Sequence, residues 1–191
     1  MQMYRLETER LILRPWCPDD VEALFDYACS PLVGPAAGWV PHHTLEDSRS
    51  VLEGVFLNNA FAWAVMRASD QVVIGSASLR KDEKRTASHA VALGYSLGPK
   101  YWGQGYGTEA ARCLVVHAFR RCEAETLACY HYPDNERSRR VILKCGFTYE
   151  GRLRNCAELQ LPGQPPLVRD ECCYSMTRTE FERIYAGVKE Q

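Results

Sequence analysis

Residues 99–119 read PKYWGQGYGTEAARCLVVHAF and place glycines at Gly103, Gly105 and Gly107. The apolar residues of 111–119 recur at helical spacing, which predicts a helix directly after the glycines. Glycine lacks a Cβ atom, so the backbone can turn sharply and approach a bound group. The first amides of a helix have no partner and lie at its positive end. The stretch therefore predicts a site for a phosphate or pyrophosphate, with a tight strand-to-helix turn without a ligand as the alternative.

Two common nucleotide-binding motifs do not fit this stretch. A P-loop requires Gly-Lys-Ser/Thr, which GQGYGTE (103–109) lacks. A dinucleotide fingerprint requires a third glycine where Thr108 stands, and it normally opens a parallel βαβ unit. The three runs that precede the glycines are instead joined by turns too short for crossovers.

Those three runs, 61–67, 71–80 and 88–97, have strand character, and the short turns between them predict antiparallel neighbours. In the third run, bulky residues such as Tyr95 alternate with small ones such as Gly94, so one face of the strand is small. A small face packs under a helix or leaves room for a ligand, and the pattern alone does not decide between the two.

The remaining segments predict an α/β (α+β) domain with a central, mostly antiparallel mixed sheet, which we expect to span residues 1–191. Thr44 is expected to cap a helix with Asp47 in a capping box, Thr177 or Thr179 to cap the last helix, and Gly146 to end another in a left-handed conformation. Strands are predicted at 10–15, 125–132, 147–155 and 167–176, helices at 17–28, 44–59, 135–145 and 177–188, and an irregular loop at 30–43.

The composition is that of a globular protein, with 191 residues, 46% hydrophobic, 25% charged and a formal charge of −1. This charge argues against a sequence-independent nucleic-acid binder. No stretch reaches the apolar length of a membrane span, and the N-terminus has no signal-peptide core, which predicts a cytoplasmic protein without a membrane partner. The nine cysteines lack CxxC spacing, which favours reduced structural cysteines over a metal site or a disulfide framework.

Three motifs, in the expected order and spanning residues 6–151, resemble the GCN5-related N-acetyltransferase (GNAT) superfamily. WGQGYG (102–107) is similar to the family signature Q/R-x-x-G-x-G/A, although Trp102 stands where the family often has Gln or Arg. LETERLILRP (6–15) and NERSRRVILKCGFTYEG (135–151) look like the subgroup related to ribosomal-protein N-terminal acetyltransferases. The resemblance implies an acetyl-CoA-dependent N-acetyltransferase of that subgroup.

The resemblance also implies a sheet of about seven strands, flanked by helices and splayed between its fourth and fifth strands, 88–97 and 125–132. The implied cosubstrate is acetyl-CoA, its pantetheine arm lies in the splay, and no metal is involved. The residues assigned in this way to acetyl-CoA are Tyr95, Ser96 and Leu97 for the arm and the thioester oxygen, and the amides of Gln104, Gly105, Tyr106, Gly107 and Thr108 for the pyrophosphate.

By the same resemblance, an amine attacks the thioester carbonyl directly. Ser138 is the candidate acid or hydrogen-bond donor for the leaving thiolate, and a plain serine at the core edge is the alternative. Asn135 is the candidate contact for the pantetheine arm, the N-cap of its helix, or both. Glu158 is the candidate base, and a solvated loop charge is an equally open interpretation. Further candidates for the base are His89, His117 and Tyr130.

The acceptor stays open among N-terminal α-amines, polyamines and small-molecule amines. An early loop that borders the acceptor pocket in this family is expected to shape specificity through Trp39, His42 and His43. A basic helical face either meets the 3′-phosphate of the ligand or is solvated, and its members are Arg137, Arg140 and Lys144.

Two other functions remain open at this point. One is a non-catalytic acyl-CoA sensor on the same fold, which would bind the ligand without releasing thiol to any amine. The other is nucleotide-linked redox chemistry, which requires NAD(P) binding. The expected partners are acetyl-CoA and an amine acceptor, without nucleic acid, and both a monomer and a homodimer are compatible with the sequence.

Overall fold

A mixed sheet of eight strands organises the computed structural model, which describes residues 4–188. The strand order is β1-β2-β3-β4-β5-β6-β8-β7, and every neighbouring pair is antiparallel except β5 and β6. The strands are β1 (Leu6–Glu7), β2 (Leu11–Pro15), β3 (Ala62–Arg67), β4 (Val73–Lys81), β5 (Ala90–Leu97), β6 (Thr126–His131), β7 (Thr148–Leu159) and β8 (Leu167–Thr177). The prediction of about seven strands missed β1, because two residues are too short to show an alternating pattern.

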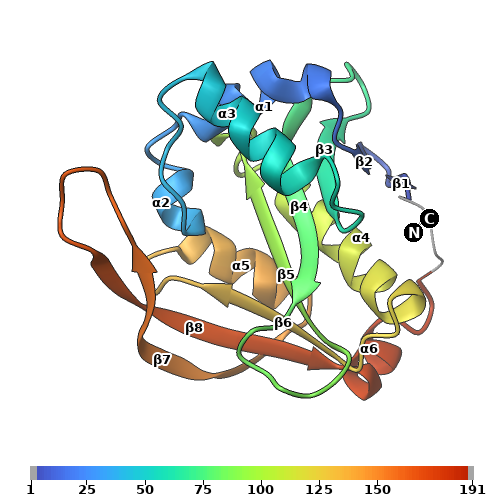
Figure 1. Cartoon of the computed structure of the whole chain (residues 1–191). Helices are drawn as coiled ribbons and strands as arrows, with labels where there is room; N and C mark the ends of the chain where they lie inside the picture. The colour runs from blue at the N-terminus through green and yellow to red at the C-terminus, as the bar shows by residue number, and fades with distance from the viewer. Residues whose placement is uncertain (1–3, 189–191) are drawn as a thin grey trace.

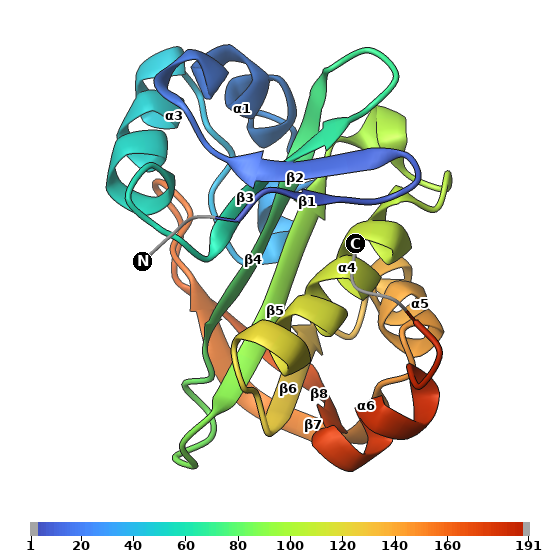
Figure 2. The same ribbon diagram turned by 90° about the vertical axis from the view of Figure 1, so that its right-hand side faces the viewer.

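Helices cover both faces of the sheet. Figure 2 shows α1 and α3 on one side and α4, α5 and α6 on the other. The helices are α1 (Val21–Ala28), α2 (Gly34–Ala37), α3 (Leu45–Val51), α4 (Tyr106–Arg121), α5 (Glu136–Lys144) and α6 (Arg178–Ile184), with short helical turns η1 (Pro18–Asp20), η2 (Leu52–Phe56) and η3 (Pro99–Tyr101). Across the described residues, none of these helices has the length and apolar character that a membrane span requires.

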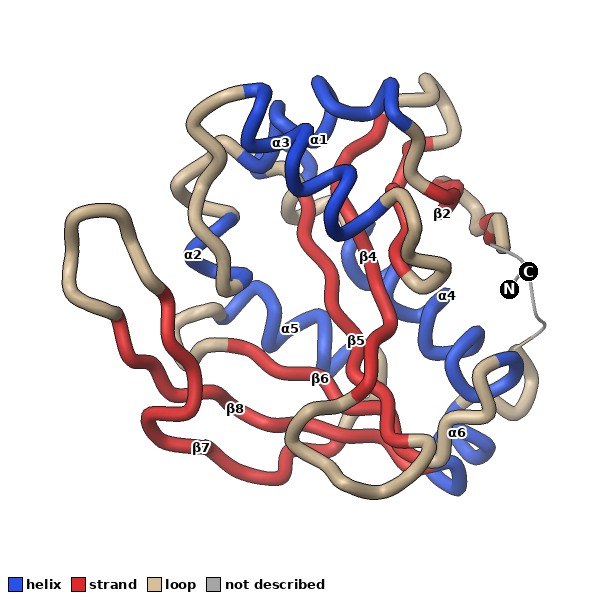
Figure 3. The backbone as a smooth tube through the Cα atoms, viewed as in Figure 1, coloured by secondary structure: helices blue, strands red, loops and turns tan. Residues whose placement is uncertain are grey.

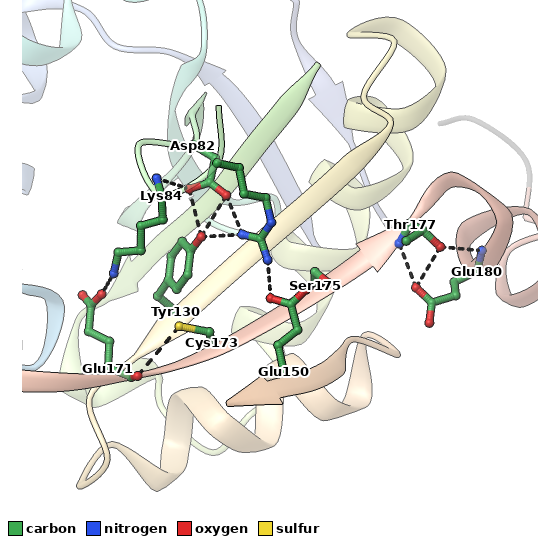
Figure 4. Close-up of polar contacts among 10 residues, drawn as sticks. Asp82, Lys84, Tyr130, Glu150, Glu171, Cys173, Ser175, Thr177 and Glu180 are labelled. Atoms are coloured by element: carbon green, nitrogen blue, oxygen red, sulfur yellow. Dashed lines mark hydrogen bonds and ion pairs between the residues drawn. The ribbon is translucent and has the colours of Figure 1, made fainter. Parts of the chain in front are cut away.

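The helix caps follow the sequence closely. Thr44 accepts a hydrogen bond from the Asp47 amide and forms the predicted capping box of α3. Thr177, rather than Thr179, caps α6, and its capping box with Glu180 is drawn in Figure 4. Gly146 follows α5 with φ 88°, as a left-handed helix end requires.

The prediction of an irregular loop over 30–43 was wrong in part. The loop expected over 30–43 contains the single-turn helix α2, and the Trp39 amide closes it by donating to the Gly34 carbonyl (3.0 Å). Gly38, at φ 89°, ends the turn. Proline and glycine are typical of loops, but here Pro35 starts a turn and Gly38 stops it.

The parallel pair β5 and β6 separates partway along its length. Pairing runs only from Ala90 with Thr126 to Leu93 with Cys129, while β5 continues to Leu97 and β6 to His131. The two strands start together and then diverge in Figure 1. A parallel pair needs a long crossover, which α4 supplies, and the predicted splay between the fourth and fifth predicted strands is confirmed.

The sheet separates two hydrophobic cores. The larger core packs α4, α5 and α6 against bulky residues such as Leu93 and Leu97 of β5. The smaller core packs α1 and the α3 region against the other face, around Leu24 and Leu52. The bulky face of β5 therefore faces α4, and its small face is turned to the side of α1 and α3.

All nine cysteines carry free thiols in the structure, in agreement with the prediction of unpaired cysteines. Burial raises the pKa of Cys113, Cys129 and Cys145 to about 12. These thiols stay protonated at neutral pH and act as small apolar side chains.

Candidate active site

The glycine stretch is a sharp turn that leads from η3 into α4. Gly103 has φ 74° and Gly105 has φ 89°, a left-handed conformation that strains any residue with a Cβ. Gly107 differs, because it lies inside α4 with ordinary helical φ, and a Cβ there would make normal contacts with Leu97 and Val141 at 3.6 Å. Two of the three glycines are therefore required by backbone conformation.

The amides of residues 104–108 form the start of α4, a helix of 16 residues. No acceptor within residues 4–188 engages these five N–H groups, whereas the next amide, that of Glu109, donates to the Gly105 carbonyl (3.0 Å). Unpaired amides at the positive end of a long helix favour an anion. The turn thus offers free amide donors, and the binding of a phosphate to them stays a prediction.

A brace from the N-terminal segment holds this turn. The Arg10 guanidinium donates to the Gln104 carbonyl (3.0 Å) and to Glu109 (2.8 Å), and it lies 4.6 Å from the centre of the Tyr106 ring. The Thr8 hydroxyl donates to the same Glu109 carboxylate (2.6 Å). Thr8 and Arg10 of the motif LETER (6–10) therefore fix the outer side of the turn. The sequence showed this motif and the glycine stretch as two separate features, and the structure joins them.

A groove of about 720 Å³ starts at this turn and continues along the gap between β5 and β6. At the turn it is lined by Gly103, Gly105, Gly107 and Thr108, together with the basic side chains of Arg137, Arg140 and Lys144. The middle of the groove is lined by Tyr95, Ser96, Leu97, Cys129, His131, Asn135 and Ser138. Its far part is lined by Trp39, Ser78, Arg80, Tyr130 and Glu171.

The main chain of β5 presents hydrogen-bonding groups to the gap. The Gly98 amide donates to Ile74 on β4 (2.9 Å), so the two-residue alternation of a strand turns the main chain of Ser96 toward β4 as well. The amides of Tyr95 and Leu97 then face the gap, beyond Leu93, where pairing with β6 ends. The Ser96 hydroxyl is also engaged, at 2.9 Å from the Ser76 hydroxyl. Tyr95 and Leu97, rather than Ser96, offer main-chain donors.

Ser138 and Tyr95 meet where the strands part. Their hydroxyl oxygens lie 2.9 Å apart, and the Tyr95 hydroxyl also donates to the Ser138 carbonyl (3.2 Å). Burial raises the pKa of Tyr95 well above its usual value, so this hydroxyl stays protonated. When Tyr95 donates to the serine oxygen, the Ser138 proton is available to a group in the groove.

Asn135 is the N-cap of α5, which confirms the capping role predicted for it. Its side-chain oxygen accepts from the Ser138 amide (3.1 Å), and its side-chain nitrogen donates to the Ala36 carbonyl of α2 (3.1 Å). Asn135 therefore ties α5, and Ser138 with it, to the early segment. A contact of Asn135 with the pantetheine arm stays a prediction.

The other residues considered from the sequence lie in different places. Glu158 is in β7 rather than in a loop, pairs with Val168, is exposed and is not one of the groove residues.

Trp39 lines the groove, whereas the ring of His42 hydrogen-bonds Ser48 (2.7 Å) and the amide of His43 donates to Asp47 (2.8 Å). His89 is exposed and His117 is buried on α4, and neither lines the groove.

A polar network fixes the loop between β4 and β5, which Figure 3 draws below the sheet. Asp82 is only 1% exposed and accepts hydrogen bonds from the Tyr130 hydroxyl (2.8 Å) and from Arg85 (2.6 Å). Arg85 also pairs with Glu150 of β7. Figure 4 shows the Tyr130 hydroxyl at Asp82. Burial raises the pKa of Tyr130, and its proton is donated to Asp82, which gives Tyr130 a structural role.

Two groove residues were missed by the sequence analysis. The ring nitrogen Nδ1 of His131 lies 2.7 Å from the Tyr132 carbonyl and must donate to it, while the buried Nε2 has no partner among the described residues. Cys129 lies in the same part of the groove with its thiol protonated. Cys129 is the last residue of β6 that pairs with β5, and His131 lies beyond it, which only the strand register reveals. The described part of the chain has no cluster of three His, Cys, Asp or Glu that could hold a metal.

Comparisons with known proteins agree with this geometry. The family model described as an acetyltransferase (GNAT) domain matches residues 10–148. An uncharacterized N-acetyltransferase of Bacillus subtilis, YoaA, is 27% identical over 78% of this chain and 85% of its own length. A solved acetyltransferase of the GNAT family from Bacillus anthracis superposes with a TM-score of 0.79 and 25% identity over 93% of this chain and 100% of its own.

The subgroup is less closely defined. The Escherichia coli ribosomal protein uS5-alanine N-acetyltransferase is 29% identical, but over only 49% of this chain and 47% of its own length. Membership in that subgroup therefore stays a prediction. The match of the family model to most of the chain and the likeness to solved acetyltransferases place this protein in the GNAT acetyltransferase family, as an acetyltransferase enzyme.

Proposed function

We propose that this protein transfers the acetyl group of acetyl-CoA to a primary amine by direct attack of the amine on the thioester. The observation that carries the proposal is the groove that joins unpaired main-chain amides of the turn, those of Gly105, Gly107 and Thr108, to the gap between β5 and β6. Such a groove suits a long ligand with an anionic end and a narrow arm. Acetyl-CoA has this shape, and the family uses it.

The turn end fits the phosphates. The amides of residues 104–108 would bind the diphosphate, with the dipole of α4 adding to the attraction. Arg137, Arg140 and Lys144 line the same end and supply positive charge for the 3′-phosphate. Arg137 is held there by the Trp102 ring, 4.0 Å away, which gives a role to the residue that departs from the family signature.

The gap fits the arm and the thioester. The amides of Tyr95 and Leu97 would hold the pantetheine arm and the thioester oxygen. A fixed donor aimed at a developing oxyanion contributes about 2.7–4 kcal/mol to catalysis. Ser138 would donate a hydrogen bond to the leaving sulfur in the arrangement in which Tyr95 donates to the serine oxygen instead of to the Ser138 carbonyl.

The thiols of the groove support direct attack. Cys129 is the cysteine among the described groove residues, and burial raises its pKa to about 12. A protonated thiol is a poor nucleophile. The amine itself therefore attacks the thioester, with no acyl-cysteine intermediate.

The amine must lose a proton before or during attack. Among the described groove residues Glu171 is the one carboxylate, and Lys84 neutralises it. An α-amine has a pKa of about 7.7–8 and is partly neutral in a cell, whereas a lysine amine is near about 10.4. The groove therefore suits an α-amine that passes its proton to water. Glu158 lies outside the groove and does not enter the proposal.

A non-catalytic sensor is not favoured. The relatives reported above are named as acetyltransferases, and a sensor would have no use for the Ser138 and Tyr95 pair at the thioester. The sensor remains a defined outcome of the test below.

The test is a thiol-release assay with acetyl-CoA and a panel of primary amines, with the acetylated product identified by mass spectrometry. We expect release that depends on the amine, faster for α-amines than for lysine side chains. Tight binding of acetyl-CoA without release to any amine would favour the sensor. Absence of acetyl-CoA binding would overturn the proposal.

A further inference from the structure

The groove opens on the sheet face that carries α1 and α3. Those helices cover the upper part of this face in Figure 1 and leave the lower part, near the ends of β4 and β6, uncovered. Ser76, Ser78 and Arg80 of β4 point to this face, because they alternate with Ala77 and Leu79, which are buried in the core on the α4 side. Arg80 and Ser78 both line the groove here.

The guanidinium of Arg80 has no partner of its own. Across residues 4–188, neither a hydrogen bond nor an ion pair engages it. Its charge nevertheless reaches the point where β5 and β6 part. Burial raises the pKa of the Cys129 thiol to about 12, and the charge of Arg80 is one of the influences that oppose this rise.

Three carboxylates on this side of the sheet are already paired. Glu171, on β8, is paired with Lys84. Asp82 is held by Arg85 and Tyr130, and Glu150 by Arg85 and Ser175. Figure 4 shows the contacts of Tyr130 and Ser175. In this polar cluster the negative charges have cationic partners inside the chain, while the nearby guanidinium of Arg80 is left available to a ligand.

Space is also available between Arg80 and the gap. Ser78 pairs with Gly94 of β5, and a Cβ on Gly94 would lie only 3.1 Å from the Ser78 hydroxyl. The missing side chain keeps this part of the floor open. At a rise of about 3.3 Å per residue, Arg80 follows Ser78 by about 6.6 Å along the strand, a distance that an arginine side chain can span.

We propose that the acceptor carries a carboxylate close to its amine and that Arg80 binds this carboxylate. The proposal rests on the proposed function and names its substrate class. Guanidinium and carboxylate form paired, charge-assisted hydrogen bonds, so Arg80 would orient the acceptor as well as attract it. A free amino acid and a peptide with an acidic residue at its N-terminus both present this chemistry. Polyamines do not.

The experiment compares matched acceptors. A free amino acid is measured against its methyl ester, and a tripeptide with N-terminal aspartate against the same peptide with asparagine, each by thiol release at saturating acetyl-CoA. We expect kcat/KM to favour the carboxylate by on the order of 10- to 100-fold in at least one pair. The pair that shows the preference distinguishes the amino acid from the peptide.

Substitutions of Arg80 test whether the carboxylate preference depends on this residue. Arg80→Gln is expected to reduce the carboxylate preference to about one while leaving the KM for acetyl-CoA unchanged, and Arg80→Lys to retain part of it. The control is Arg183→Gln, which changes an exposed arginine on α6 and should leave the preference intact.

Two results would overturn the proposal. One is a wild-type enzyme that acetylates amines with no carboxylate preference, and the other is a preference that survives in Arg80→Gln. Both leave the proposed function standing, since acetyl transfer still occurs. A protein that acetylates none of the amines would instead remove the proposed function, and this inference with it.

Discussion

The groove end at α4 offers unpaired main-chain amides beside three basic side chains, whereas the end at β4, β6 and β8 offers side chains alone. At the first end, the lining amides of Gly105, Gly107 and Thr108 belong to a turn shaped by the left-handed conformations of Gly103 and Gly105. At the second end, Arg80, Tyr130 and Glu171 come from three different strands. One end is built within a few consecutive residues, and the other depends on how distant strands align.

The difference has consequences for evolution and for function. A main-chain site needs only the backbone conformation, so most of its side chains are free to vary. A side-chain site changes its ligand with one substitution. We infer that the α4 end serves the part of the reaction common to the family, and that the β4 end sets what is specific to this protein.

The strongest test of the main-chain end is Gly105→Val. Valine is strained at φ 89°, and its Cβ would lie 3.2 Å from the Arg10 guanidinium, so the turn must change shape. Backbone strain of about 1–3 kcal/mol corresponds to binding of acetyl-CoA weakened by on the order of 10- to 100-fold. Calorimetric titration measures it, with Gly54→Val as the control, because a Cβ at Gly54 meets open space. Unchanged affinity would show that the turn does not hold the ligand.

The second test addresses the middle of the groove. Ser138→Ala removes the hydroxyl proposed to bond the leaving sulfur, while Tyr95 can still donate to the Ser138 carbonyl and keep the fold. We expect kcat to fall by on the order of tenfold or more and the affinity for acetyl-CoA to stay within about twofold. Steady-state kinetics and calorimetry separate the two effects. An unaltered kcat would assign the proton to water.

The two ends of the groove also differ in how well the sequence predicts them. The glycine turn, the start of α4, the cap at Asn135 and the position of Ser138 on α5 are local features, and spacing along the chain predicted them. The splay between β5 and β6 was predicted only through the resemblance to the family, since nothing in either strand shows where pairing stops.

The side-chain end was not predictable in this way. Arg80 is an ordinary exposed position in an alternating strand, and its isolation depends on ion pairs such as Lys84 with Glu171, which join β8 to a distant loop. His131 is exceptional only because its Nε2 is buried without a partner. The position of Glu158 in β7, rather than in the loop before β8, also depends on the register with β8.

A third test asks whether the main-chain end depends on side chains behind it. Arg10→Ala removes the donor to the Gln104 carbonyl and the partner of Glu109. Loss of a charge-assisted hydrogen bond of about 1.5–3 kcal/mol, partly offset by water at this exposed site, predicts affinity for acetyl-CoA reduced by roughly three- to tenfold. Arg5→Ala is the matched control, since Arg5 contacts only its neighbour Glu7 among the polar partners described. Equal effects of the two variants would mean that the brace is dispensable.

The smallest expected effect is that of Gly107→Ala, which tests whether a glycine without a left-handed φ is needed in the turn. Gly107 lies in α4 without a left-handed φ, and a Cβ there would rest at 3.6 Å from Leu97 and Val141. Gly107→Ala should therefore leave the affinity for acetyl-CoA within about twofold and raise the free energy of unfolding by about 0.4–1 kcal/mol, because alanine restricts the unfolded chain. Calorimetry and urea denaturation measure the two quantities. A large loss of affinity would mean that the ligand passes too close to residue 107 for any side chain.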